Sequence, residues 1–415
     1  MNIWILQSGE PLQLDKGNHR GMRAINLSNI LINRGHHVTI FSSTFNHTKK
    51  THRFLSTTEI EYSAKLKFVL IKSPGYKSNI SLNRIWDHIV FAVRLNKYLL
   101  KHNEIPNAIF VGFPPIESAF VMLRWAFNRK IFTVLDLKDR WPDIFVQALP
   151  DIFSPLGKLF FYPFYYLRDK CLYYSSHFVT ISESYSLWIN RISKSIKPTT
   201  VGYLTSNITL GSFEETDVAV NWLKNAGIDL SHRRRLIFVG SLTRSFDFTL
   251  IIKLLDIFRD NNVYLEFLIC GTGELEEYFK KIFSGYPNVL FLGWIDKPVI
   301  DVLSKNSTAL VAPYRNTPDF IDSIPNKVID SFSRGLPVFS TLEGEVKDIL
   351  SKYKVGFFID NLTLYDSFNE VLRILNQEED YKEMRDRCLK IYKYKFEFNH
   401  VYSNLAKILE RGYNI

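Results

Sequence analysis

Short apolar runs alternate with longer amphipathic segments along most of this 415-residue chain, and that alternation limits the folds open to it. Residues 2–6 and 37–42 are apolar runs that predict strands. Between them, residues 20–34 carry apolar side chains at helical spacing, and Gly35 follows as a helix stop. Further strands are predicted at residues 67–71, 108–112, 131–136 and 177–181. This alternation predicts an α/β fold, with a parallel sheet covered by helices on both faces.

The same pattern begins a second time after an interruption. It weakens between about residues 201 and 232, then resumes with LIFVGS at 236–241 and a predicted helix at 249–260. Further strands are predicted at residues 264–270, 289–292 and 309–312, and residues 381–415 read as helical. We therefore predict a first domain at residues 1–205, a second at 206–395, and a C-terminal helix at 396–415 that crosses back to the first. Two such domains facing each other would form a cleft, with ligands at the carboxyl ends of strands.

The composition narrows the classes of partner. The formal net charge is +10, which attracts nucleic acid, anionic lipid or phosphorylated small molecules. The three cysteines are far apart, so they suggest neither a disulfide framework nor a zinc site. The N-terminus lacks the pattern of a signal peptide, and no apolar run approaches the ~18 residues of a spanning helix. We expect a cytoplasmic protein that meets a membrane, if at all, as a peripheral protein on its inner face.

The segment PDFIDSIPNKVIDSFSRGLPVFS carries the strongest chemical signal. Asp322 and Asp330 lie eight residues apart, and the loop between them runs into a predicted helix beginning near Asn326. A helix N-terminus suits a phosphate, so Ser323 and Asn326 are candidate nucleotide ligands, and Lys327 would add a point charge to a diphosphate. The two carboxylates suit hydroxyl pairs of a sugar and a ribose. A capped surface helix with two solvated aspartates accounts for the same residues equally well.

The spacing Asp322-x7-Asp330, followed by RGLPVFST, resembles the acid-x7-acid motif of glycosyltransferase family 4, the retaining GT-B enzymes. Both acids are usually Glu in that family, so each carboxylate here is one methylene shorter. The PNK-x-x-D-x-x-x-x-G-L-P block is similar to a bacterial branch that builds O-antigen, capsule and exopolysaccharide units. The resemblance implies a GT-B fold of two Rossmann-like domains across a cleft, with the acceptor in the first and the nucleotide-sugar in the second. It assigns Asp322 to the donor sugar and Asp330 to the ribose.

Three further blocks of the second domain resemble the same family. FVGSLTRSFDF is similar to the strand and loop that open the donor domain, which implies that Gly240 and Arg244 lie at the donor diphosphate. The family's second cation, a Lys before a Gly, has no clear counterpart, and Lys327 would substitute for it. ICGTGELEEYFKK resembles the glycine-rich turn near the nucleobase, and FLGWID the strand end that holds the base. These blocks add the nucleotide ligands Gly271, Gly273, Glu274 and Ile295. For the GTGE tetrapeptide alone, an ordinary strand-to-helix turn is the favoured account, but it is not favoured once the block stands in order with the others.

The first-domain blocks are weaker matches. GEPLQLDKGNHRGMRAINLSNILINRGHHVTIFSS resembles the opening unit of the family, which implies that Gly17, Arg20 and Arg23 contact the acceptor or the leaving phosphates. The alternative is that the arginines are solvated in a first helical turn. LDLKDRWPDIF resembles the D-x-R-D-x-W-P stretch of the bacterial branch, where Asp136 or Asp139 would accept a proton from the acceptor hydroxyl. A structural salt bridge to a neighbouring Arg140 or Lys138 is the competing role.

The resemblance also implies a reaction. A hexosyl or N-acetylhexosaminyl group would pass from a nucleotide-sugar, expected to be UDP-linked, to a polyprenyl-diphosphate-linked saccharide, with retention and with no required cofactor or metal. Two segments rich in basic and aromatic residues, 81–102 and 156–174, are candidates for a membrane-surface patch. Residues 81–102 fit a buried helix better, whereas residues 156–174 favour the membrane.

Other functions fit parts of the sequence. A catalytically silent nucleotide-sugar-binding subunit is suggested by the Asp-for-Glu replacements and the missing second cation. A nucleotide-sugar epimerase of the same fold would need no acceptor. Nucleic-acid binding is suggested only by the net charge, and no RNP, helix-turn-helix or zinc-finger pattern accompanies it, so we expect no nucleic-acid partner.

Overall fold

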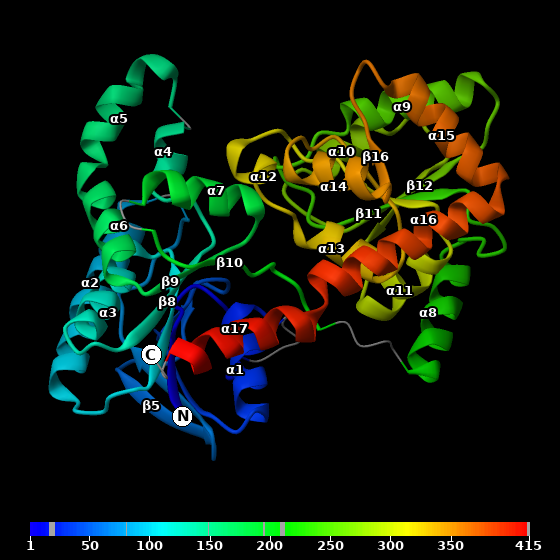
Figure 1. Ribbon diagram of the computed structural model, residues 1–415. Coiled ribbons are helices and arrows are strands. Elements are labelled where there is room, and N and C mark those ends of the chain that lie inside the picture. Colours follow the sequence, from blue (N-terminus) through cyan, green and yellow to red (C-terminus); the bar gives the residue numbers. More distant parts are fainter. Residues whose placement is uncertain (16–20, 80, 148, 194–195, 208–211, 413–415) are drawn as a thin grey trace. The chain divides into compact units, whose positions relative to one another are not determined.

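The computed structural model describes residues 1–15, 21–79, 81–147, 149–193, 196–207 and 212–412 (Figure 1). The chain divides into two compact units. Unit 1 comprises Met1–Asn207 and Phe398–Ile415, and unit 2 comprises Ile208–Glu397. Each unit has its own parallel sheet with flanking helices, so the predicted α/β class is confirmed.

The sheet of unit 1 has eight strands in the order β10-β9-β8-β7-β1-β2-β6-β5. All neighbouring strands are parallel except β5 and β6, which pair antiparallel; the expectation of a purely parallel sheet was wrong at this edge. β5 ends the sheet with mostly exposed residues, as antiparallel edge strands commonly do. The strands are β1 Asn2–Leu6, β2 His37–Ser43, β5 Thr58–Ser63, β6 Leu66–Ile71, β7 Ala108–Phe113, β8 Phe132–Leu137, β9 His177–Thr180 and β10 Thr199–Val201, with a separate short pair, β3 Phe45–Asn46 and β4 Thr51–His52.

Helices cover both faces of this sheet, each over its own apolar cluster. One cluster joins the sheet to α1 and α17, and the other joins it to α2, α3 and α6. The C-terminal helix α17 lies beside α1, and Arg34 of α1 donates two hydrogen bonds to Glu410 of α17 at 2.8 and 2.7 Å. The helices are α1 Arg23–Asn33, α2 Leu82–Lys101, α3 Ile116–Phe127, α4 Asp143–Gln147, α5 Ser154–Phe160, α6 Tyr162–Tyr174, α7 Glu183–Ile192 and α17 Phe398–Gly412, with a 3-10 turn at Asp151–Phe153.

The sheet of unit 2 has six parallel strands in the order β13-β12-β11-β14-β15-β16. Numbered along the chain, this is the 3-2-1-4-5-6 order of a doubly wound nucleotide-binding fold, whose ligands bind where the order reverses. That switch point lies between β11 and β14 in unit 2, and between β1 and β7 in unit 1. The strands are β11 Arg235–Val239, β12 Glu266–Cys270, β13 Val289–Gly293, β14 Ala309–Ala312, β15 Val338–Ser340 and β16 Gly356–Phe358.

One helix of unit 2 lies where the sequence pattern indicated none. Helix α8, Phe213–Asn225, falls within the interruption between residues 201 and 232, and a capping box of Ser212 and Glu215 begins it. The box satisfies two backbone N–H groups at the helix start, which offsets a weak amphipathic pattern. The remaining helices are α9 Thr249–Asp260, α10 Glu276–Ile282, α11 Lys297–Lys305, α12 Pro318–Ile321, α13 Asn326–Ser333, α14 Glu345–Tyr353, α15 Leu364–Asn376 and α16 Glu378–Ile391, which a π-helical turn at Tyr392–Phe396 follows.

Candidate active site

The switch point of unit 2 brings Gly240 and Lys327 together. Gly240 follows β11 with φ 153°, a conformation that favours glycine. Lys327 lies in the first turn of α13, and a Cβ built on Gly240 would stand 2.5 Å from its Nζ. The glycine therefore leaves room for the ammonium at the carboxyl end of the sheet, where the fold places phosphates.

The ammonium of Lys327 is enclosed by aromatic rings. Nζ lies 4.3 Å from the ring centroid of Phe238, 4.1 Å from that of Phe246 and 5.1 Å from that of Tyr314. Among the described residues it has no hydrogen-bond partner, and burial lowers the pKa of Lys327 to about 7. A buried cation without an acceptor is costly, so this arrangement suits an anion that supplies the missing oxygen atoms.

The two aspartates of the acid-x7-acid motif flank this position along the chain. Asp322 caps the C-terminus of α12, and Asp330 lies one turn inside α13; both are half-buried and both have polar contacts. Burial and the nearby Asp330 carboxylate raise the pKa of Tyr314, one of the three aromatic residues around the Lys327 ammonium. Ser323 donates a hydrogen bond from Oγ to the carbonyl of Phe320 at 3.3 Å.

The predicted helix start is present at Asn326. Helix α13 begins there after Pro325, and no side chain of the described residues caps its N-terminus. Val328 N–H donates a hydrogen bond to the carbonyl of Pro325 at 2.9 Å, so the N–H groups of Asn326 and Lys327 are the ones that the helix start offers to a phosphate, as the sequence analysis expected.

The glycine-rich turn after β12 packs against the loop after β11. A Cβ on Gly271 would overlap the carbonyl oxygen of Gly240, and one on Gly273 would overlap the backbone of Leu242. Backbone hydrogen bonds join the loops, including Leu242 N–H to the carbonyl of Thr272 at 2.9 Å. Both glycines are therefore required by the close approach of two backbones, a structural role that the sequence analysis did not assign.

The cation and the acid predicted on these two loops are neighbours. Nε of Arg244 lies 3.9 Å from Oε1 of Glu274, and the Arg244 side chain is 87% exposed. Arg244 is thus an exposed surface cation at the carboxyl edge, whereas Lys327 is an enclosed one. Arg315, which follows β14, is a further cation at this edge that the sequence analysis missed; its position three residues after a predicted strand end was the available signal.

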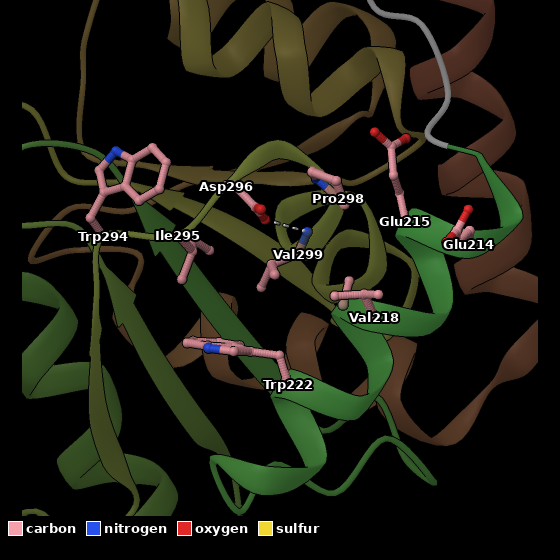
Figure 2. Close-up of a pocket in the computed structure, with 10 residues that line it drawn as sticks. Glu214, Glu215, Val218, Trp222, Trp294, Ile295, Asp296, Pro298 and Val299 are labelled. Carbon is pink, nitrogen blue, oxygen red and sulfur yellow. Dashed lines mark hydrogen bonds between the residues drawn. The ribbon is translucent and has the colours of Figure 1, made fainter. Parts of the chain in front are cut away.

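Ile295 lines a pocket of about 430 Å³ between α8 and the start of α11 (Figure 2). The indoles of Trp222 and Trp294 line the same pocket, and Asp296 caps α11 through a 3.3 Å bond from Val299 N–H. The backbone of Ile295 was the predicted contact for the nucleobase. The structure adds the two exposed tryptophans, which the sequence analysis did not single out.

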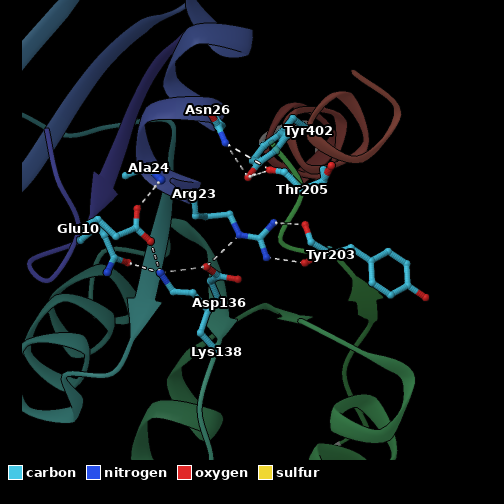
Figure 3. Close-up of polar contacts among 11 residues, drawn as sticks. Glu10, Arg23, Ala24, Asn26, Asp136, Lys138, Tyr203, Thr205 and Tyr402 are labelled. Carbon is cyan, nitrogen blue, oxygen red and sulfur yellow. Dashed lines mark hydrogen bonds and ion pairs between the residues drawn. The ribbon is translucent and has the colours of Figure 1, made fainter. Parts of the chain in front are cut away.

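In unit 1, Arg23 and Asp136 form a buried ion pair (Figure 3). Nε of Arg23 lies 3.3 Å from Oδ2 of Asp136, and the side chains are 1% and 0% exposed. Arg23 also donates hydrogen bonds to the carbonyls of Gly202 and Tyr203, which tie α1 to the segment after β10. Burial tends to lower the pKa of Arg23, but the Asp136 carboxylate raises it above its ordinary value. This placement favours the structural role for Asp136 and leaves Arg23 no exposed surface for an acceptor.

The other residues predicted to contact the acceptor or to take its proton are not part of this ion pair. Gly17 and Arg20 lie outside the described residues. Asp139 is half-buried and accepts a 2.8 Å hydrogen bond from Arg140 N–H, so it stays nearer solvent than Asp136. Lys138 lies between them and pairs with Glu10, Nζ to Oε1 2.5 Å.

A pocket of about 230 Å³ opens at the switch point of unit 1. Its polar lining includes Gln7, His47, Tyr76, Arg84, His88 and Lys138. Mixed hydroxyl, imidazole, amide and cationic groups beside aromatic faces are suited to a saccharide or its phosphate. None of His47, Tyr76, Arg84 or His88 was predicted, although His47 and Tyr76 each follow a strand by a few residues.

Burial and neighbouring cations hold the histidines of this pocket neutral. Burial, Lys50 and Arg84 lower the pKa of His47 to about 4, and burial, Arg84 and His47 lower the pKa of His88 to about 3. Nδ1 of His47 and the hydroxyl of Tyr76 share a hydrogen bond. Neutral imidazoles can accept hydrogen bonds from hydroxyl groups. Among the described residues, no three His, Cys, Asp or Glu side chains cluster as a metal site would require.

Residues 227–391 match the family model described as Glycosyl transferases group 1. The protein is a glycosyltransferase. The match runs from before β11 to the end of α16, so it contains Gly240, Lys327, Asp322 and Asp330. No curated protein sequence matches the chain.

Solved structures of glycosyltransferase fold resemble the whole chain. Sucrose-phosphate synthase from Thermosynechococcus elongatus aligns with a TM-score of 0.67 at 12% identity, covering 99% of this chain and 98% of that one. HepE of Anabaena, solved with UDP-glucose, aligns at 0.63 and 13% identity, covering 99% and 100%. WaaG, a glycosyltransferase involved in lipopolysaccharide biosynthesis, aligns at 0.59 and 13%, covering 99% of each chain. The predicted GT-B fold is confirmed; the assignment to family 4 and to its O-antigen branch stays a prediction.

Proposed function

We propose that this glycosyltransferase transfers a hexosyl or N-acetylhexosaminyl group, with retention, from a UDP-sugar to a lipid-linked saccharide in bacterial surface polysaccharide synthesis. The observation that carries the donor site is the enclosed ammonium of Lys327, which has no acceptor in the described part of the chain and lies against Gly240 at the switch point of unit 2. A diphosphate at this position would supply the missing acceptor oxygens. The UDP and UDP-glucose complexes of HepE support UDP as the nucleotide.

The proposed donor site assigns a role to each polar group at this edge. Lys327 and the open N-terminus of α13 bind the diphosphate, and Arg244 closes over it from the exposed loop after β11. These donors stabilise the charge that develops on the leaving diphosphate, and losing one donor of this kind costs about 3–4 kcal/mol of transition-state stabilisation. Asp330 binds the ribose and Asp322 the transferred sugar.

The acceptor half rests on unit 1. The acceptor saccharide occupies the pocket at its switch point, where His47, Tyr76 and Lys138 offer hydrogen bonds to hydroxyl groups. Binding to a lipid is suggested by the apolar tip, which runs from the residues before α5 to the start of α6. We define the apolar tip by its exposed side chains, Ile152, Phe153, Leu156, Leu159, Phe160 and Tyr162.

The apolar tip suits the surface of a bilayer. Leu159 and Phe160 are 72% and 70% exposed, and Lys158 lies between apolar neighbours on the same helix. Large exposed apolar patches mark interaction sites, and a basic residue among apolar ones suits an anionic lipid interface. No helix within the described ranges meets the length and hydropathy that crossing a membrane requires.

A binding and turnover experiment tests the donor half. UDP binding is measured by calorimetry, and UDP release is measured from a panel of UDP-sugars with and without polyprenyl-diphosphate N-acetylglucosamine. We expect Lys327→Met and Asp330→Asn to weaken UDP binding, and Lys253→Met, an exposed lysine of α9, to leave it unchanged. If the protein binds UDP but releases no UDP from any donor, the result would favour a catalytically silent subunit over a transferase. If UDP is released but no glycosylated acceptor forms, the result would favour an epimerase or a hydrolase.

A vesicle experiment tests whether the apolar tip binds a lipid surface. We expect the wild-type protein to sediment with vesicles containing phosphatidylglycerol, and the Leu159→Glu/Phe160→Glu variant to stay in the supernatant. The matched control is Leu362→Glu, which changes an exposed leucine of unit 2. Equal sedimentation of all three proteins would show that the apolar tip does not bind the membrane.

A further inference from the structure

A buried histidine and a buried glutamate face each other across α2 and α3, beside the switch-point pocket of unit 1. Nδ1 of His88 lies 3.8 Å from Oε2 of Glu117, and both side chains are 8% exposed. Around them lies the apolar cluster that joins α2, α3 and α6 to the sheet. Neither residue caps its helix through a side-chain hydrogen bond: Ser81 caps α2, and Glu117 lies in the first turn of α3 after the N-cap residue Pro115.

Hydrogen bonding within the described chain does not explain the pair. Nδ1 of His88 and both carboxylate oxygens of Glu117 are buried, and none of these atoms has a hydrogen-bond partner in another described residue. Buried polar groups are nearly always hydrogen-bonded, and apolar residues of similar volume would pack here at lower cost. The pair is therefore better explained by chemistry than by stability.

The two residues connect two separate hollows of unit 1. His88 lines the pocket of about 230 Å³ at the switch point. Glu117 lines a groove of about 640 Å³ between α2 and α3, whose walls include Val93, Phe120 and Trp125. A proton passed from His88 to Glu117 would thus leave the acceptor pocket toward the outer helical face.

We propose that His88 and Glu117 form a proton relay for the transfer reaction, in which Nε2 of His88 takes the proton of the acceptor hydroxyl and Nδ1–H passes its proton to Glu117. The relay rests on the proposed function. It replaces Asp136, whose carboxylate is fully buried and paired with Arg23. Catalytic hydrogen bonds are often long before the substrate binds, so the 3.8 Å separation is expected to shorten in the complex.

The relay balances the bonds of the reaction. The acceptor oxygen forms a bond to the anomeric carbon, and the bond from that carbon to the diphosphate oxygen breaks, with its electron pair leaving on the nucleoside diphosphate. The hydroxyl proton moves to Nε2 of His88, and the Nδ1 proton moves to the Glu117 carboxylate. Glu117 then loses its proton to water in the groove.

The protonation behaviour of the pair fits a relay better than a single base. Burial raises the pKa of Glu117 to about 7, whereas burial, Arg84 and His47 lower the pKa of His88 to about 3. An imidazole that cannot hold a positive charge passes its proton on, and a carboxyl titrating near neutral pH is well matched to receive it. The other titratable and charged groups around the pair and its pocket are Arg84 and Asp87 of α2, Cys171 of α6, and His47, Tyr76, Glu10 and Lys138.

Kinetics of the full-length protein test the relay. Acceptor-dependent UDP release is measured from pH 5 to 9 for wild type, His88→Asn and Glu117→Gln, with polyprenyl-diphosphate N-acetylglucosamine as acceptor. We expect kcat to fall about 100-fold or more in both variants, with the KM for the UDP-sugar and the unfolding midpoint unchanged. We expect the wild-type rate to fall as the pH drops below about 7, and Glu117→Gln to lack that fall.

Controls separate the relay from a packing role. His177→Asn changes a half-buried histidine of β9, and Glu59→Gln changes a carboxylate of β5; both are expected to keep the wild-type rate and pH profile. Imidazole is expected to restore part of the activity of His88→Ala. Wild-type kcat and pH profile in Glu117→Gln would overturn the relay alone. The absence of any transfer by the wild-type protein would overturn the proposed function and the relay with it.

Discussion

Replacing Lys327 by methionine is expected to stabilise the free protein while it removes the proposed diphosphate site. Burial lowers the pKa of this lysine from 10.5 to about 7. Keeping the lysine charged in the folded state therefore costs free energy. At pH 7 the difference between the folded and unfolded pKa values corresponds to about 4 kcal/mol against folding. Attraction between the ammonium and three aromatic rings returns about 0.5–1 kcal/mol per ring, so removing the charge leaves a net gain of about 2 kcal/mol.

Calorimetric unfolding with and without UDP measures this prediction. A gain of about 2 kcal/mol in a unit of this size raises the Tm by roughly 4–8 °C. UDP at about 100 times its dissociation constant would add about 2.7 kcal/mol to the wild-type protein, and that addition should shrink in Lys327→Met. Because the folded pKa is depressed, wild-type stability should also rise as the pH increases from about 7 to 10.5, and the variant should lack this rise.

The control for this experiment is Lys253→Met, which removes an exposed ammonium that donates to Asn361 at 2.8 Å. Its Tm should stay within about 1 °C of wild type, since exposed polar contacts contribute little. A lower or unchanged Tm for Lys327→Met would show that the buried ammonium is already compensated. A full UDP-induced shift in that variant would remove Lys327 from the donor site.

Three other perturbations follow from particular contacts. Asp136→Asn should destabilise unit 1 by about 3–5 kcal/mol in urea unfolding, because it leaves Arg23 charged and unpaired in the core; a loss below 1 kcal/mol would contradict the buried pair. Gly271→Ala should destabilise unit 2 by about 2 kcal/mol or more and weaken UDP binding, since its methyl group would overlap a backbone carbonyl; unchanged unfolding would show that the loop can yield. Arg34 lowers the pKa of Glu410 to about 2, so the stability that this pair contributes is present above about pH 4.5 and lost as the pH falls toward 2. Glu410→Gln should therefore cost about 1 kcal/mol at pH 7 and nothing at pH 2, whereas an equal loss at both pH values would exclude the ion pair as the cause.

Many strands and helices of both units could be predicted from the local pattern of apolar residues in the sequence. The strand at residues 2–6, the helix at 249–260 and the strand at 309–312 have the observed bounds, because buried parallel strands read as continuous apolar runs. The pattern failed at helix α8, where the signal was the capping box rather than apolar periodicity. It failed again at β5, since an exposed edge strand buries too little to constrain its sequence.

The residue types at the carboxyl edge of unit 2 could be read from the sequence, but their geometry could not. The sequence analysis named Lys327 as a point charge for a diphosphate, but nothing local to it indicates that Phe238, Phe246 and Tyr314 enclose its ammonium. Those rings come from segments up to 89 residues away, from 238 to 327. Only the parallel order of β11 and β14 brings them to one edge.

The sequence by itself determined where strands and helices alternate, and therefore that two α/β units form and that candidate ligand-binding groups follow their strands. The tertiary structure decided which of those groups are reachable. Arg23 and Asp136 have the residue types of a binding site, yet folding pairs them in the core, whereas His88 and Glu117 carry no motif and lie beside a pocket. Charge pairing and burial depend on which strand ends and helix faces meet across the fold, and that information is spread over residues far apart in the chain.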